Sequence, residues 1–305
     1  MSLVWLLGCA EGGLMWAESW EVLALADDGA LVDMTFTRGN TGLWAGAGKA
    51  RASISAKGEG AVLFGLDGMP GDVEELNRGL AIGPDRLSED GGVWMVRLAE
   101  GNDLDGFRDL RVSVEGRGRS EPVEMGDWTV QAVETLGHIQ GFSRVGQRDR
   151  LIDGNAVILH RVGERPPALR GATRMAAFVL DDTLSIGVDQ VGSQVLAWAI
   201  VDGVNLPTDD AVLRIGPNNE VQLDFRPTLD LAVQIVPRRP RVRTDPLDHL
   251  TGPEKLAVDT WVGTPTRRVS RGSAIGVYDG RPLSSSAVLL WSDNDDPLAL
   301  AEDPG

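Results

Sequence analysis

The chain has 305 residues, 42% hydrophobic and 24% charged, proportions that suit two globular domains and exclude long disordered or fibrous architectures. A formal net charge of -16 disfavours both nucleic acid and anionic membrane surfaces as partners. The single cysteine, Cys9, excludes an intramolecular disulfide and a cysteine-based zinc site, which favours a reducing, cytoplasmic setting.

The N-terminal residues 6–10 read Leu-Leu-Gly-Cys-Ala, which is similar to the cleavage box of a bacterial lipoprotein. Such a signal needs a positive start and an apolar region of roughly 7 to 15 residues, and the stretch before Cys9 has neither. We therefore expect a first strand with Leu3, Trp5 and Leu7 on one face. No apolar run approaches the roughly 18 residues of a membrane span, so the sequence predicts a soluble protein.

Apolar and polar residues alternate along many short segments, which predicts half-buried strands. The clearest segments are 110–115, 184–189 and 229–235. Turn signals rich in Asp, Asn and Gly punctuate the chain at 27–29, 67–68, 90–92, 153–155, 202–203 and 279–280. Because a parallel sheet would need a helix after nearly every strand, this pattern favours antiparallel sheets.

Two segments favour helices. Residues 72–82 offer Asp72 as an N-cap, followed by Glu74 and Glu75 at the positive end of the helix dipole. A second helix is expected over residues 245–262, interrupted near Gly252-Pro253. The 38 glycines and many short strands otherwise indicate barrels or sandwiches.

A polar, turn-rich stretch at 117–122 lies where a first β-domain of ordinary size would end. We place the boundary near residue 126, which gives a first domain of residues 1–126 and a second of 127–305. Strand patterning resumes at 128–133, and the last strands are expected at 273–277 and 287–291. The acidic tail from residue 292 is expected to fray.

Several chemistries lack their motifs. The chain has no G-x-S-x-G and no H-E-x-x-H sequence, and Gly48-Lys49 is followed by Ala50 where a phosphate loop needs a hydroxyl. The three histidines, at 138, 160 and 249, are far apart in sequence, so a His-rich metal site is not expected. We therefore expect a protein without a metal or cofactor.

Two stretches carry a resemblance to a known family. Glu18-Ser19-Trp20, followed by a hairpin through Asp28-Gly29 to 36–38, is similar to the opening of the carotenoid hydratase (hydroxyneurosporene synthase) family. The stretch 154–163 is similar to a second motif of that family, with Gly154, His160 and Gly163 in matching positions.

This resemblance implies two lipocalin-like antiparallel β-barrels packed together with a few short helices. The superfamily includes AttH-like proteins, oxidative-stress survival proteins and fungal Diels–Alderases. Leu159 stands where the hydratases have aspartate, and Val162 where they have tryptophan. Hydration of a carotenoid by that aspartate is therefore not implied for this chain.

Lipocalin-like barrels can enclose apolar ligands, and this chain has nine tryptophans. Six of them are candidates to line a ligand cavity, with core packing as the alternative: Trp16, Trp20, Trp44, Trp94, Trp128 and Trp198. Indole faces stabilise cations, and a buried carboxyl of raised pKa could protonate an alkene.

Four residues are candidates for that chemistry: Asp33, Glu134, Asp189 and His160. Strand alternation places Asp33 opposite Val32 and Met34, so it faces a cavity only if those two pack outward. The same argument favours solvent exposure for Asp189. His160 lies on an apolar face, where it is either a hydrogen-bonded core histidine or a functional one.

The sequence thus supports one leading hypothesis and two alternatives. The first is a cofactor-independent enzyme acting on a long apolar isoprenoid or polyene by protonation-driven hydration or cyclisation, or by pericyclic ring closure. The second is a non-catalytic carrier or stress-survival protein for a hydrophobic ligand. The third, a purely structural domain, predicts barrels without a cavity.

Overall fold

The structure is a computed structural model that describes residues 16–41, 44–55, 62–68, 72–102, 106–120, 122–125, 128–145, 148–164, 173–181, 184–191, 194–206, 208, 211–226, 228–244 and 265–294. The strand expected at residues 3–7, the helix expected at 245–262 and the tail beyond residue 294 lie outside these ranges.

The first sheet has twelve strands in the order β4-β3-β2-β1-β12-β11-β9-β8-β7-β6-β5, with β10 paired to β11. Their bounds are β1 (Trp16–Ala26), β2 (Leu31–Thr41), β3 (Trp44–Ser55), β4 (Val62–Gly68), β5 (Val73–Glu75), β6 (Gly79–Ile82), β7 (Asp85–Asp90), β8 (Val93–Asn102), β9 (Gly106–Gly118), β10 (Val123–Met125), β11 (Trp128–Val145) and β12 (Arg148–Glu164).

The second sheet has nine strands in the order β16-β15-β14-β13-β21-β20-β19-β18-β17. Their bounds are β13 (Thr173–Val179), β14 (Leu184–Val191), β15 (Gln194–Val201), β16 (Val204–Leu206), β17 (Val212–Ile215), β18 (Val221–Asp224), β19 (Leu231–Thr244), β20 (Pro265–Tyr278) and β21 (Arg281–Asn294).

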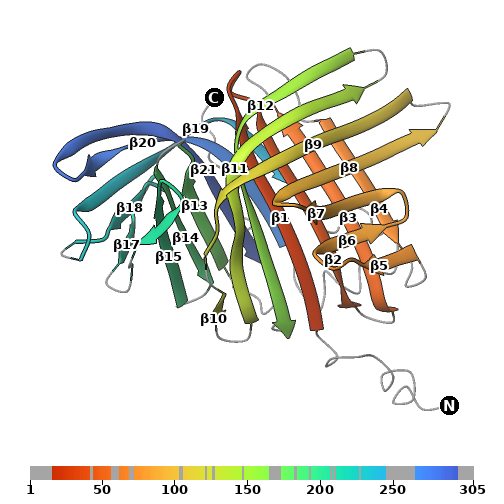
Figure 1. Cartoon of the computed structure of the whole chain (residues 1–305), viewed down its shortest axis with the longest axis horizontal. Coiled ribbons are helices and arrows are strands. Elements are labelled where there is room, and N and C mark those ends of the chain that lie inside the picture. The colour runs from red at the N-terminus through yellow and green to blue at the C-terminus, as the bar shows by residue number, and fades with distance from the viewer. Residues whose placement is uncertain are drawn as a thin grey trace.

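The two sheets lie side by side and are antiparallel throughout the described strands (Figure 1). The first is a near-closed barrel, because β4 and β3 at one end of the strand order approach β8, β6 and β5 at the other. The second sheet curves into a half-barrel. The predicted all-β class with two lipocalin-like barrels is confirmed in this form. No helix in the described ranges is long and apolar enough to cross a membrane.

Three apolar layers follow from strand alternation. On β1, Val22 and Ala24 face the interior of the first barrel, whereas Leu23 and Leu25 face the second sheet. The layer between the sheets, which we call the junction, combines residues such as Leu23 and Leu159 with Phe178 and others of the second sheet. A third layer fills the concave face of the half-barrel.

The helix predicted over residues 72–82 is wrong, because this segment forms the short strands β5 and β6, joined by a turn. Gly79 has a φ of 120°, a value that favours glycine, and a Cβ there would collide with the backbone of Leu87. The sequence predicted Glu74 and Glu75 in the first turn of a helix, whereas the structure has them on β5.

Most of the predicted strands and turns are confirmed. Segment 110–115 lies in β9, 184–189 in β14 and 273–277 in β20. The turns at 27–29, 202–203 and 279–280 join neighbouring strands, and Gly29, Gly203 and Gly280 all have positive φ. The turn signals at 67–68 and 153–155 instead fall within β4 and β12.

The chain changes from one sheet to the other between Glu164 and Thr173. The sequence placed the domain boundary near residue 126, but β11 and β12 complete the first sheet. β12 returns to pair with the full length of β1, from Trp16 with Glu164 to Ala26 with Gly154. This long-range pairing has no signal in the local sequence.

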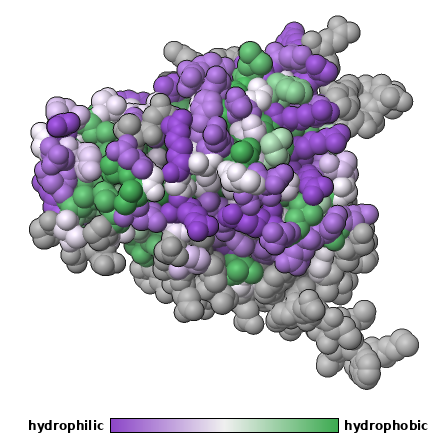
Figure 2. Space-filling view, viewed as in Figure 1, coloured by the Kyte–Doolittle hydropathy of each residue, from purple (hydrophilic) through white to green (hydrophobic). Residues whose placement is uncertain are grey.

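The visible surface is largely hydrophilic, with scattered apolar areas on the side of the half-barrel and smaller ones elsewhere (Figure 2). The exposed large apolar side chains of the second sheet include Val212, Ile215, Ile275 and Val277. Single apolar side chains of this kind are ordinary on protein surfaces.

Candidate functional site

A cluster of seven charged or titratable side chains lies at the end of the first barrel, where β1 begins. We call it the barrel-end cluster, and its members are Glu18, Arg38, Glu75, Arg78, Glu89, Glu134 and His160. Glu18 shares the interior face of β1 with Trp20 and Val22, because residues two apart on a strand point the same way. The cluster therefore caps an otherwise apolar interior.

His160 on β12 is held between two carboxylates. Its Nε2 lies 2.8 Å from Glu18 Oε1 and its Nδ1 lies 3.2 Å from Glu134 Oε1. The strands β1 and β11 flank β12 on either side, so each carboxylate approaches the imidazole from a neighbouring strand. The imidazole is 18% exposed, and thus reachable from solvent.

A β-bulge places Glu134 in the cluster. On β11, Val133 pairs with Leu159 and Thr135 pairs with Ile158, so Glu134 is an extra residue without a partner on β12. Val133 packs in the junction, and the inserted residue turns toward the barrel interior. Bulges commonly re-aim a side chain in this way.

Two arginines extend the cluster across the end of the barrel. Arg38 on β2 contacts Glu18 at 2.5 Å and Glu75 on β5 at 2.9 Å. Arg78, in the turn between β5 and β6, contacts Glu134 at 2.5 Å and Glu89 at 3.3 Å. The short β5–β6 hairpin is thereby tied to β2 on one side and to β11 on the other.

Aromatic rings form the floor of this cluster. The indole of Trp20 stacks on the imidazole of His160, with centroids 3.6 Å apart and an interplanar angle of 6°. Trp94 lies 5.2 Å from Trp20, centroid to centroid. The guanidinium carbon of Arg78 lies 5.2 Å from the Trp94 ring, within the range of a cation–π contact.

The contacts set the charge of each group. Burial alone would raise the pKa of Glu18 and of Glu134, but hydrogen bonds from His160 and from Arg38 or Arg78 outweigh it and lower both pKa values below 4.5. Burial opposes the charged form of His160, yet the two carboxylates raise its pKa above 6.5. The arrangement therefore favours two ionised carboxylates on either side of an imidazolium.

A second charged group lies in the junction, on the opposite faces of the same strands. We call it the junction network, and its members are Glu21, Asp33, Arg161, Arg174, Asp189 and Arg267. Glu21 contacts Arg161 of its own sheet and both Arg174 and Arg267 of the second sheet. Three carboxylates thus meet three guanidinium groups away from water.

The junction network lowers the pKa values of some of its members and raises those of others. Burial would raise the pKa of Glu21, but the three guanidinium groups hold it far below 4.5. Burial and the charge of Arg174 lower the pKa of Arg161 to about 10. Asp189 and Glu21 outweigh the effect of burial on Arg174 and raise its pKa. All three groups are therefore ionised at neutral pH.

Two of the four predicted catalytic candidates belong to the junction network. Asp33 is hydrogen-bonded to Arg267 at 2.7 and 3.0 Å, and it points away from the barrel interior because Val32 and Met34 fill that interior. Asp189, for which the sequence favoured solvent exposure, is fully buried against Arg174. The face opposite its apolar neighbours is covered by the other sheet, which strand alternation alone does not reveal. The other two candidates, His160 and Glu134, are brought together in the barrel-end cluster.

The six candidate tryptophans divide among three settings. Trp20 and Trp94 are buried in the first barrel, and Trp198 is buried in the junction, 5.4 Å from Phe178. The side chains of Trp16, Trp44 and Trp128 lie outside the described part of the structure. The buried indoles pack as core residues, and none lines the pocket described next.

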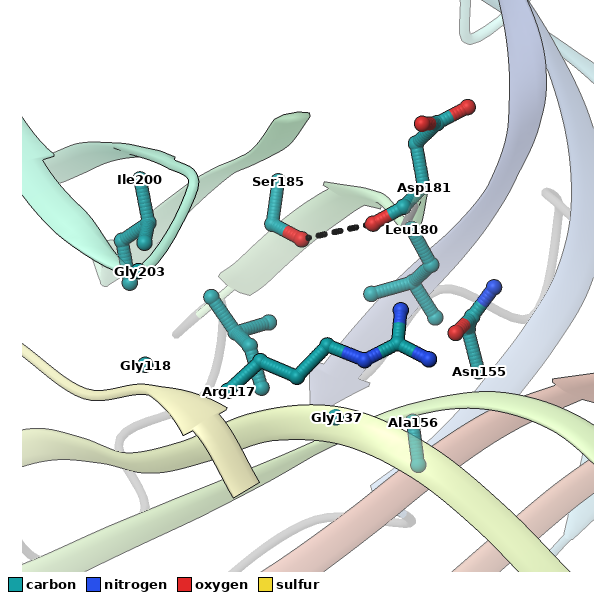
Figure 3. A pocket seen from close by; sticks show the side chains of 11 residues that line it. Arg117, Gly118, Gly137, Asn155, Ala156, Leu180, Asp181, Ser185, Ile200 and Gly203 are labelled. Carbon is teal, nitrogen blue, oxygen red and sulfur yellow. Dashed lines mark hydrogen bonds between the residues drawn. The ribbon is translucent and has the colours of Figure 1, made fainter. Parts of the chain in front are cut away.

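A small pocket lies where the two sheets meet (Figure 3). Arg117 extends from β9 toward Asn155, and Ser185 donates a hydrogen bond to the backbone oxygen of Asp181 at 3.3 Å. The volume of the pocket is about 20 Å³, which is room for one water molecule. The pocket is far smaller than the several hundred cubic ångströms of a typical ligand cavity.

Metal binding has no support in the described ranges, where no group of three His, Cys, Asp or Glu side chains is placed to hold a metal ion. His160 and its two carboxylate partners use their polar atoms on one another and on Arg38 and Arg78.

Sequence reasoning missed several members of both groups. Glu18 could have been found, because it precedes Trp20 by two residues on an alternating strand and opens the motif that carried the resemblance. Arg174 stands at the start of the apolar strand β13, a sign of a buried ion pair. Arg78 had no signal, since its segment was interpreted as a helix.

The near-closed barrel packed against a half-barrel is the AttH-like double-barrel fold. Among solved structures, an AttH-type protein of Nitrosomonas europaea matches with a TM-score of 0.59 and 12% identity, over 94% of this chain and 95% of that one. CghA with bound Sch210972 matches with a TM-score of 0.61 and 9% identity, over 93% and 89%. A second structure of CghA matches with a TM-score of 0.59 and 11% identity, over 92% of this chain and 89% of that one.

At these identities the likeness establishes the fold, and it confirms the double barrel that the sequence resemblance implied. The sequence matches no protein-family model and no curated protein. Leu159, at the position of the hydratase aspartate, packs in the junction and faces away from His160. The chemistry of the site is therefore to be argued from its own residues.

Proposed function

We propose that the chain binds a small, apolar, unsaturated molecule at the barrel-end cluster and promotes its ring closure without a cofactor. The observation that carries the proposal is the fixed position of His160, which is held between Glu18 and Glu134 and stacked on Trp20. Polar groups and flat aromatic faces there adjoin an apolar barrel, a combination typical of small-molecule sites.

The fold supports a small-molecule role. CghA, whose structure resembles this chain over 93% of its length, was crystallised with Sch210972. Ligand sites occur in the mouths of β-barrels, and the side chains of the barrel-end cluster are 10% to 64% exposed.

The charge states favour a pericyclic reaction over the two protonation-driven routes. Hydration and cationic cyclisation begin with proton transfer from an acid, which works best with a pKa near the working pH. The pKa values of Glu18 and Glu134 are lowered, so these carboxyls are ionised at neutral pH and have no proton to give. A pericyclic ring closure converts two π bonds into two σ bonds and moves no proton.

Binding geometry would supply the acceleration. A flexible chain loses most of its freedom when its two reacting ends are held together, and effective molarities of at least about 10⁵ M are known for well-oriented intramolecular reactions. The imidazole of His160, which is 18% exposed and is backed by the stacked indole of Trp20, is the flat ring at the barrel end against which a conjugated chain could lie.

The second candidate function is that of a carrier without catalytic activity. The apolar interior of the first barrel is filled by buried side chains such as Phe36, Met34 and Leu98, which favours binding at the barrel end over enclosure of a long substrate. A carrier needs no acid and no catalytic geometry.

The test is incubation with a neutral ketone in which a conjugated diene and an enone are joined by a short alkyl tether. We expect a cyclic isomer of unchanged mass, formed faster than in buffer, with the acceleration reduced in His160→Gln. A product heavier by one water would show that the reaction is hydration and not ring closure. Tight binding of unchanged ketone would establish the carrier, and the absence of both binding and product would overturn the two candidates together.

A further inference from the structure

Three arginines lie directly opposite one another on the outer face of the first barrel. Arg86 on β7 pairs with Arg97 on β8, and Arg97 pairs with Arg111 on β9. Their neighbours in sequence, such as Val96 and Val112, point into the barrel interior, and all three arginines are exposed. We call them the arginine row. Like charges placed directly opposite destabilise a sheet, so a negatively charged partner would relieve a repulsion within this row.

The chain leaves most of this charge uncompensated. Acidic residues outnumber Lys and Arg by 45 to 29, yet in the described ranges neither Arg86 nor Arg97 forms an ion pair or a hydrogen bond. Arg111 contacts the carboxylate of Asp109 at 2.9 Å. The arginine row therefore has two exposed guanidinium groups that are available to an acidic partner.

Apolar side chains continue the arginine row across the sheet. Arg111 pairs with the partly exposed Phe142 on β11, and Phe142 pairs with Leu151 on β12, which is 80% exposed. Met95, which is 51% exposed, lies two residues from Arg97 on the same face. Among the described residues, Met95 and Leu151 are the exposed large apolar side chains of the first sheet. With the arginine row, these three apolar residues form one amphipathic surface, which we call the outer strip.

The surroundings of the outer strip limit the shape of its partner. Asp153 on β12 and Glu115 on β9 are exposed on one side of it, and the ion pair of Arg144 with Asp149 lies on the other. A broad anionic surface such as a bilayer would meet these carboxylates as well as the arginines, and the net charge of -16 would add to the repulsion. A narrow chain can follow the strip and avoid them.

The length of the outer strip fits a short peptide segment. Its ends, Arg86 and Leu151, lie on strands separated by four spacings of about 4.8 Å, or about 19 Å in all. About six residues of extended chain cover this span. We infer that the outer strip binds an extended acidic segment of another protein, with acidic residues over the arginines and large apolar residues over Phe142 and Leu151. This surface lies on the opposite face of the sheet from the barrel-end cluster, so it is independent of the proposed function.

A synthetic peptide tests the partner class. It has three glutamates followed by leucine, phenylalanine and leucine, with a rhodamine label, and fluorescence anisotropy gives its Kd. We expect Arg86→Gln/Arg97→Gln to weaken binding about three- to tenfold, which corresponds to the loss of two exposed ion pairs. Leu151→Ser should weaken it as well. Arg214→Gln/Arg281→Gln, which removes two exposed arginines of the second sheet, is the matched control and should keep the Kd.

The order of residues in the peptide tests the geometry of the strip. A peptide with the same six residues in alternating order cannot place its acidic residues together over the arginine row, so it should bind more weakly. Circular dichroism checks that each variant is folded. Equal affinity for the two peptides, an unchanged Kd in Arg86→Gln/Arg97→Gln, or no binding of the first peptide would overturn the inference. Vesicles containing phosphatidylserine, or an oligonucleotide, that bind the arginine row more tightly than the peptide would also overturn it, because the partner would then be a membrane or a nucleic acid.

Discussion

Glu21 on β1 and Arg174 on β13 are joined by two hydrogen bonds, of 2.8 and 2.9 Å, although they belong to different sheets. Arg174 continues to Asp189 on β14 with contacts of 2.5 and 2.9 Å. Both carboxylates and the guanidinium are buried. This bridge gives the junction a directional contact that its apolar side chains cannot provide, and it lies directly behind the strand that carries Trp20.

We predict that Arg174→Met lowers the free energy of unfolding by about 3–5 kcal/mol, because Glu21 and Asp189 would remain buried with one cation fewer. Urea denaturation measures the change. Arg174→Met/Asp189→Leu removes one charge of each sign and should lose less than the single variant. Arg226→Met, which removes an exposed ion pair with Asp224, should leave stability nearly unchanged. Equal losses in the single and double variants would contradict the prediction.

The pKa of His160 should depend on Glu134. Glu134→Gln keeps the side-chain shape but removes one of the two carboxylates that raise this pKa, so the pKa should fall toward 6.5. Titration of the imidazole carbon-bound protons by NMR measures the shift. Glu115→Gln, a substitution at an exposed position of β9, serves as the control and should leave the His160 titration in place. An unchanged pKa in Glu134→Gln would show that the bulge does not bring the two groups together.

The stability of the protein should decline as the pH rises above about 6.5. Because the folded-state pKa of His160 is raised above that value, its contribution is fully present below pH 6.5 and is lost as the pH rises through the folded-state pKa. Urea denaturation at a series of pH values measures the profile. His160→Gln should flatten the decline on the alkaline side, whereas His138→Gln controls for the loss of a histidine elsewhere. An identical alkaline slope in His160→Gln would argue against the prediction.

On the acidic side of the same pH profile, stability should decline as the pH falls. The lowered pKa values of Glu18, Glu21 and Glu134 contribute stability above their ordinary value of 4.5, and this stability is lost as the pH falls through the folded-state values. We expect Glu18→Gln to be less stable at neutral pH and to lose less stability on acidification. A parallel shift of the entire profile would contradict this assignment.

Gly187 on β14 should be intolerant of a side chain. A Cβ at this position would overlap the indole of Trp198, the residue that pairs with Gly187 on β15. Gly187→Ala should cost about 1–3 kcal/mol of folding free energy by overpacking. Gly216→Ala is the matched control, since its Cβ would meet ordinary contacts from 3.5 Å outward. Thermal unfolding compares the two variants, and equal stabilities would show that the indole moves aside without cost.

Local sequence determined most of the strands of this protein and the faces of their side chains, although segment 72–82, predicted as a helix, forms β5 and β6. The alternation at 184–189 predicted β14. The period of two also places the neighbouring residues Leu159 and His160 on opposite faces of their strand. The turn residues of several hairpins can also be recognised in the sequence, because positive φ favours glycine. These features depend only on neighbours in the chain.

The tertiary structure alone decided what each face meets. Asp33 and Asp189 stand on faces that the sequence could assign equally to solvent or to a second sheet, and only the packing of the two sheets buries them against arginines. Likewise, Glu134 reaches His160 because of a bulge, and Glu18 reaches it because β12 pairs with β1 from more than a hundred residues away. Long-range pairing and bulges leave no trace in local periodicity, since they arise from contacts between segments that are distant in sequence.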